Sequence, residues 1–137
     1  MAKEGKFVPK GKAKVDHLDW GDMKWLSRPR DTQAKKLCVI EVLLRPGGGH
    51  NYHKHPGQEE VIYVIEGAVE QWLGKQRKVL RTGDSVFIGA GQVHASFNVF
   101  RKNAKVLAIL GPCKGRAGYG LVDVSKRKPW SGLRKQA

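Results

Sequence analysis

Cysteine is scarce in this chain, and the two residues present, Cys38 and Cys113, lie far apart. Neither belongs to a CxxC pair, so the sequence does not predict a disulfide framework or a zinc ribbon. Long hydrophobic runs are also lacking, because no apolar stretch approaches the roughly 18 residues that a membrane-spanning helix needs. The basic N-terminus is not followed by the apolar segment of a secretory signal. These features predict a cytoplasmic protein with reduced thiols and no membrane segment.

Acidic residues are few: 12 Asp and Glu stand against 26 Lys and Arg, which gives a formal net charge of +14. Residues 1–14 hold five lysines against Glu4, and residues 126–137 hold five basic residues and no acid. The remainder, residues 15–125, carries 16 basic and 11 acidic residues, a net charge of +5. No nucleic-acid-binding motif or aromatic platform accompanies the basic tails. We therefore expect solvated tails and not specific nucleic-acid binding.

Helical periodicity is nearly absent, whereas short apolar runs bounded by glycines are frequent. This pattern favours an antiparallel sandwich or barrel. The sequence thus predicts an all-β domain over residues 15–125, flanked by short disordered basic tails at 1–14 and 126–137. Residues 15–30 are expected to form a covering strand or turn. The strands are expected at 35–44, 60–66, 68–74, 77–81, 85–88, 94–100, 105–111 and 118–124.

Two glycine-bounded stretches carry the residues of chemical interest. The first, residues 47–67, places His53 and His55 two residues apart and a carboxylate shortly after them. Two residues apart on a strand means the same face. The second stretch, residues 83–98, offers a further imidazole, that of His94. Together they predict a mixed nitrogen and oxygen site for a transition-metal ion.

The spacing within these stretches resembles the two-part signature of the cupin superfamily. The residues that carry the resemblance are Gly47, His53, His55, Glu60 and Gly67 in the first part and Gly83, Gly89, Gly91, His94 and Asn98 in the second. The resemblance implies a double-stranded β-helix, or jelly-roll, barrel. It also implies four metal ligands: His53, His55, Glu60 and His94. At one position the chain departs from the family, because Gly89 stands where a proline is usual.

Glu59 competes with Glu60 for the role of carboxylate ligand. Glu60 lies seven residues before Gly67, as in the family pattern, and strand alternation sends Glu59 to the other face. Three imidazoles and one carboxylate suit a divalent ion of iron, manganese, nickel, copper or zinc, and the sequence does not choose among these metals. A six-coordinate ion would keep open positions, which is typical of catalytic sites.

Five further residues are candidates for the wall of a small-ligand pocket. By strand alternation, Ile62 and Val64 share the face of Glu60, while Ser96 and Asn98 share the face of His94. Asn98 is also a candidate brace for a turn. His50 precedes His53 by three residues, so it leaves the ligand face if the strand is regular. We place His50 at the pocket rim or in a solvated loop.

The leading hypothesis is a single-domain cupin that acts on a small molecule as a dioxygenase-like metalloenzyme. One alternative is a non-redox isomerase or lyase acting on a sugar or hydroxy acid, in which the metal serves as a Lewis acid. Another is a ligand-binding or sensory cupin without turnover. The predicted strand over residues 61–65 is apolar on both faces. If the second sheet of the same chain buries only one face, a second copy of the chain must cover the other, so we expect a homodimer.

Overall fold

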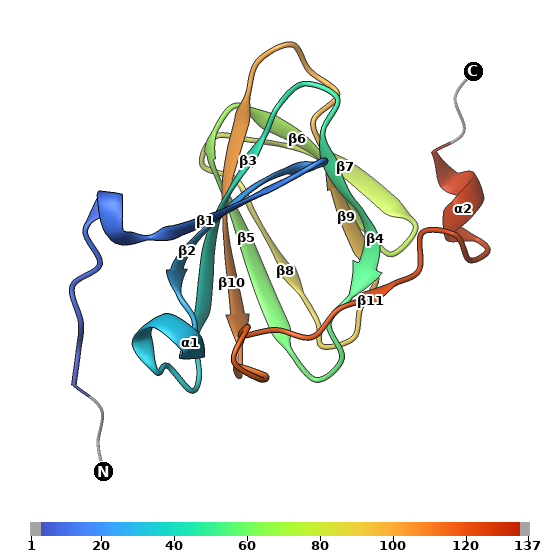
Figure 1. Ribbon diagram of the computed structural model, residues 1–137. Coiled ribbons are helices and arrows are strands. Elements are labelled where there is room, and N and C mark those ends of the chain that lie inside the picture. Colours follow the sequence, from blue (N-terminus) through green and yellow to red (C-terminus); the bar gives the residue numbers. More distant parts are fainter. Residues whose placement is uncertain (1–3, 135–137) are drawn as a thin grey trace.

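Two antiparallel sheets form the body of this protein (Figure 1), as seen in a computed structural model that describes residues 4–134. The large sheet has the strand order β1-β2-β3-β10-β5-β8, and the small sheet has the order β11-β4-β9-β6-β7. The strands are β1 Lys14–Leu18, β2 Gly21–Ser27, β3 Cys38–Leu44, β4 Gly49–Lys54, β5 Glu59–Glu66, β6 Ala68–Leu73, β7 Gln76–Arg81, β8 Ser85–Ile88, β9 His94–Phe97, β10 Ala104–Gly111 and β11 Val122–Asp123. The helices are the 3-10 turn η1 Lys10–Lys12, α1 Pro29–Thr32 and α2 Trp130–Leu133. The expected all-β fold of antiparallel sheets is confirmed.

Alternating burial along the strands builds the main core. Strands β3 and β10 bury every second residue, as the period of two requires when one face of a sheet packs inward. Strand β5 does the same with Ile62 and Val64, while Tyr63 faces outward. Burying each such aliphatic side chain stabilises the fold by roughly 1.5–3 kcal/mol. The core lies between the two sheets and supports the site described below.

The strands expected between residues 35 and 111 are present, with differences at their ends. The strand expected at 94–100 ends at Phe97, because Asn98 turns the chain. The Asn98 side-chain amide donates hydrogen bonds to the carbonyl oxygens of Leu44 and Lys102, both at 2.8 Å. Residues 14–27 form the hairpin of β1 and β2, which covers one edge of the large sheet next to β3.

The C-terminal segment packs on the outer face of the small sheet. Trp130 and Leu133 of α2 lie against a second apolar cluster that contains Tyr52, Trp72 and Phe97. The sequence gives no sign of this contact, because two apolar residues among basic ones carry no period. The predicted division into a barrel and two flexible tails stays a prediction, and residues 1–3 and 135–137 of those tails lie outside the described residues. No helix within residues 4–134 is long and apolar enough to cross a membrane.

Candidate metal centre

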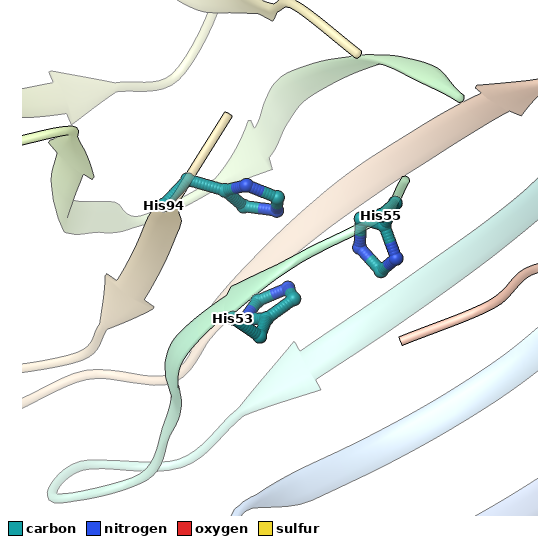
Figure 2. A group of neighbouring side chains, drawn as sticks. All are labelled: His53, His55 and His94. Carbon is teal, nitrogen blue, oxygen red and sulfur yellow. The ribbon is translucent and has the colours of Figure 1, made fainter. Parts of the chain in front are cut away.

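The side chains of three buried histidines, His53, His55 and His94, lie close together (Figure 2). His53 lies on β4 and His55 directly follows that strand, while His94 begins the neighbouring strand β9. His53 and His94 are direct cross-strand partners, which places their side chains on the same inner face. One nitrogen of each ring lies within 4.8 Å of one nitrogen of the other two, and all three residues are buried. This group could therefore hold a metal ion.

Glu60 reaches the same point from the opposite sheet. Its Oε1 atom lies 2.9 Å from His94 Nε2 and 3.5 Å from His55 Nε2. Glu60 is 5% exposed, whereas Glu59 is exposed on the outer face, as strand alternation predicted. Donor atoms that bind one ion at about 2.0–2.2 Å lie roughly 3–3.5 Å from each other, so this spacing suits neighbouring ligands. The structure thus groups the three histidines and brings Glu60 next to His94 and His55, and a metal site made of all four residues stays a prediction.

Backbone carbonyls fix which nitrogen of each ring faces the centre. His53 Nδ1 donates to Asn51 O at 2.6 Å, and His94 Nδ1 donates to Gln92 O at 2.9 Å. His55 Nδ1 donates to Gly120 O at 2.6 Å. A carbonyl oxygen only accepts, so Nδ1 carries the proton in all three rings and Nε2 presents a lone pair. This is the arrangement that orients histidine ligands in metal sites.

The central atoms lack hydrogen-bond donors among the described residues. Glu60 Oε1 and His94 Nε2 are both buried without a hydrogen-bond partner. The two atoms are close, but the direction between them does not suit a hydrogen bond. Buried acceptors that face one another without a donor are costly, and a bound cation removes that cost. The donor set therefore fits a transition-metal ion.

Burial also favours the neutral form of the His53 and His55 imidazoles, which is the form that binds a metal. Desolvation lowers the pKa of His53 well below its ordinary value, and the neighbouring His50 and His94 rings add to that effect. Desolvation lowers the pKa of His55 as well, although the charge of Glu60 opposes the change. Neutral imidazoles at ordinary pH follow from both effects.

His50 lies beside the ligands, contrary to the expectation for a regular strand. Its ring stacks on that of His53 with the centroids 3.7 Å apart, and the Trp20 ring stacks on its other side at 4.2 Å. The cause is a bulge in β4. His50 pairs with Ser96 and His53 pairs with His94, so β4 advances by three residues where β9 advances by two. The extra residue turns His50 back to the inner face. Burial lowers the pKa of His50 to about 3.

The cavity beside the histidines holds three of the five predicted pocket residues. Ile62, Ser96 and His50 line it. Val64 does not, because it is fully buried deeper in the aliphatic core. Asn98 does not either, because its side chain braces the turn after β9. Both residues lie further along their strands than this cavity extends.

Sequence reasoning missed four residues that build the site. Trp20, at the tip of the β1–β2 hairpin, and Tyr119 both line the cavity, and the Tyr119 ring lies 5.3 Å from that of His55. Gln58 holds Gly120 in place by accepting a hydrogen bond from its N–H at 2.9 Å. The glycine-rich run around Tyr119 was the available signal, because such runs let a backbone approach a site closely.

Comparisons with known proteins agree with this geometry. A family model described as Cupin domain matches residues 40–110, a range that contains all four predicted ligands. Protein SchB of Streptomyces halstedii is 32% identical over 106 residues, which cover 77% of this chain and 77% of that protein. The polyketide synthase CurC of Streptomyces cyaneus is 30% identical over 103 residues, or 75% of this chain and 67% of that protein. The crystal structure of a predicted oxalate decarboxylase from Thermotoga maritima is alike in fold, with a TM-score of 0.70 and 19% identity over 78% of this chain and 99% of that one.

Proposed function

Because this chain belongs to the cupin family, we propose that it is a metal-dependent enzyme that acts on a small molecule. The observation that carries the proposal is the set of buried acceptors at the end of the barrel. His53, His55 and His94 each donate Nδ1–H to a backbone carbonyl, so their Nε2 lone pairs remain for an ion. Glu60 supplies the oxygen ligand beside two of those rings.

The proposed ligands are His53, His55, Glu60 and His94, and the proposed ion is divalent iron, manganese, nickel, copper or zinc. Such an ion, when bound, supplies Lewis acidity or one-electron chemistry and open positions for substrate. The chain contributes the rest. Its carbonyls orient the rings, Glu60 offsets part of the charge, and the apolar cavity wall excludes water from the reacting groups.

Dioxygenase-like oxidation or cleavage is the reaction we propose to test first. Four protein ligands on a six-coordinate ion leave two positions, which can take a substrate and dioxygen or the two oxygen atoms of a chelating substrate that dioxygen then attacks directly. The alternative is non-redox lyase or isomerase chemistry at the same site. Turnover of candidate substrates by metal-loaded protein, with and without dioxygen, distinguishes the two. Equal rates in both conditions would exclude the oxygenase reaction.

Metal content tests the site itself. Protein purified without an affinity metal or added ions is expected to carry close to one ion per chain, measured by mass spectrometry. The double variant His53→Ala, His94→Ala is expected to lose that ion. The matched control His17→Ala removes an exposed histidine remote from the site and is expected to keep it. A parent protein that neither carries an ion nor takes one up on titration would contradict the proposal.

We further propose that the protein works as a cytoplasmic homodimer. Both cysteines are free, as suits a reducing compartment. The outer face of the large sheet exposes Val61, Tyr63, Ile65 and Phe87 on the neighbouring strands β5 and β8. A contiguous apolar face of this kind suits the two-fold contact of a second copy.

A further inference from the structure

The cavity beside the proposed metal ligands has an apolar wall that limits what can bind there. Its volume is about 40 Å³, which is room for about three water molecules. The wall opposite the histidines is made of side chains such as Met23, Ile40, Val106 and Ala108, from the inner face of the large sheet. A ligand that fills this space must be compact, with an apolar body.

Charge limits the ligand further. Among the described residues, Glu60 is the charged side chain on the cavity wall, and none of the basic residues of this strongly basic chain lines it. A divalent ion, three neutral imidazoles and the Glu60 carboxylate sum to a net charge of +1. A ligand that binds as a monoanion brings the site to zero. A dianion leaves an uncompensated negative charge against aliphatic side chains, which is costly in an apolar interior.

We infer that the substrate is a small, uncharged molecule with an apolar body and two adjacent oxygen atoms, which loses one proton as it chelates the ion. The proton passes to solvent, and the resulting monoanion neutralises the site. This inference rests on the proposed function, and it sets the substrate class apart from dicarboxylates such as oxalate. The methyl-sized body of the ligand would lie toward Met23 and Ala108.

Two chelators of nearly equal size test the inference: acetohydroxamic acid, which is uncharged at neutral pH, and oxalate. Cobalt(II)-loaded protein is titrated with each, and binding is followed by the visible spectrum of the ion. Each affinity is divided by that ligand's affinity for cobalt(II) in water, so that chelating strength cancels. We expect the ratio to favour acetohydroxamic acid at least about tenfold. Calorimetry in two buffers is expected to show about one proton released per ligand bound.

The outcomes separate this inference from the proposed function. If cobalt(II) binds the parent and not the His53→Ala, His94→Ala variant, but oxalate binds as well as acetohydroxamic acid, the substrate inference is overturned and the metal site stands. If cobalt(II) does not bind the parent protein, both the proposed function and the substrate inference that rests on it are refuted.

A variant of the wall gives an independent measurement. Met23→Lys places a cation in the cavity and is expected to raise the relative affinity for oxalate about tenfold, because it offsets the second negative charge. The matched control Met23→Leu keeps the wall apolar and is expected to leave the ligand preference unchanged. Unchanged preference in a folded Met23→Lys variant would contradict the inference. If the Met23→Lys variant does not fold, the relative affinity of the parent protein for the two chelators decides whether the inference holds.

Discussion

The side chain of Gln58 holds the loop that follows β10 next to the site through hydrogen bonds. Its amide donates hydrogen bonds to Pro112 O at 2.7 Å and to Gly118 O at 3.0 Å, and its oxygen accepts from Gly120 N–H. Gln58 is 1% exposed, so no water competes for these bonds. Because Gly120 O in turn receives the Nδ1 proton of His55, this single residue connects the final loop to a proposed metal ligand.

Replacing Gln58 by leucine is expected to lower both stability and metal affinity. Each buried backbone group left without a partner costs roughly 1–3 kcal/mol in the free energy of unfolding. Looser placement of Gly120 is expected to weaken cobalt(II) binding by about tenfold. Urea denaturation and metal titration measure the two effects. The control Gln76→Leu changes an exposed side chain at the start of β7 and is expected to shift stability by no more than about 0.5 kcal/mol. Equal effects of both substitutions would contradict this account.

Gly89, the position at which the chain departs from the family pattern, tolerates a side chain. A Cβ atom there meets only Gln92 Oε1, at 3.6 Å, and the backbone does not need the left-handed region. Gly89→Ala is therefore expected to raise the free energy of unfolding by about 0.4–1 kcal/mol, because it restricts the unfolded chain. Gly91 has a φ of +75°, so Gly91→Ala is expected to destabilise the protein. Denaturation curves that fail to separate the two variants would refute the prediction.

At the scale of elements, strand β8 divides its side chains between two environments. Ile88 is 1% exposed and faces the core, whereas Phe87 is 57% exposed on the outer face of the large sheet. Ile88→Ala is expected to cost about 2–5 kcal/mol of stability, because it leaves a cavity. Phe87→Glu is expected to spare the fold and to dissociate the proposed homodimer, as measured by analytical ultracentrifugation. A protein that is already monomeric would contradict the second expectation.

The strands could be predicted because alternating apolar residues and the glycines that end each run are local signals in the sequence. The observed strands β5 and β10 agree closely with the predicted ones. The same alternation placed Glu60, and not Glu59, on the inner face. The sequence left His50 either at the pocket rim or in a loop, because the one-residue bulge that turns its side chain to the inner face leaves no mark in the sequence. Trp20 and Gly120 were missed for a different reason. Each reaches the site from an element far away in the chain, and such contacts follow from the assembled fold.

At the scale of the whole molecule, buried histidines make stability depend on pH. Burial lowers the pKa of His50 to about 3 and also lowers the pKa values of His53 and His55, so the folded protein binds fewer protons than the unfolded chain below about pH 6.5. Stability is therefore full above that pH and falls as the pH decreases. Between its folded and unfolded pKa values, His50 contributes a slope of up to about 1.4 kcal/mol per pH unit, and His53 and His55 act in the same direction.

Urea denaturation of metal-free protein between about pH 7.5 and pH 5 measures this dependence. The His50→Gln variant is expected to show a shallower decline, because one of the three proton-binding differences is removed. A parent protein with the same unfolding free energy across that range would contradict the expectation.

The hydrogen bond from His55 to Gly120 can form only late in the synthesis of the chain. Its two partners are 65 residues apart, and the acceptor comes after every strand except β11. A growing chain therefore contains all four proposed ligands well before the carbonyl that orients one of them has left the ribosome. We expect ribosome-bound chains that stop before residue 118 to hold metal weakly, and high-affinity loading to begin only once the final loop has closed over Gln58.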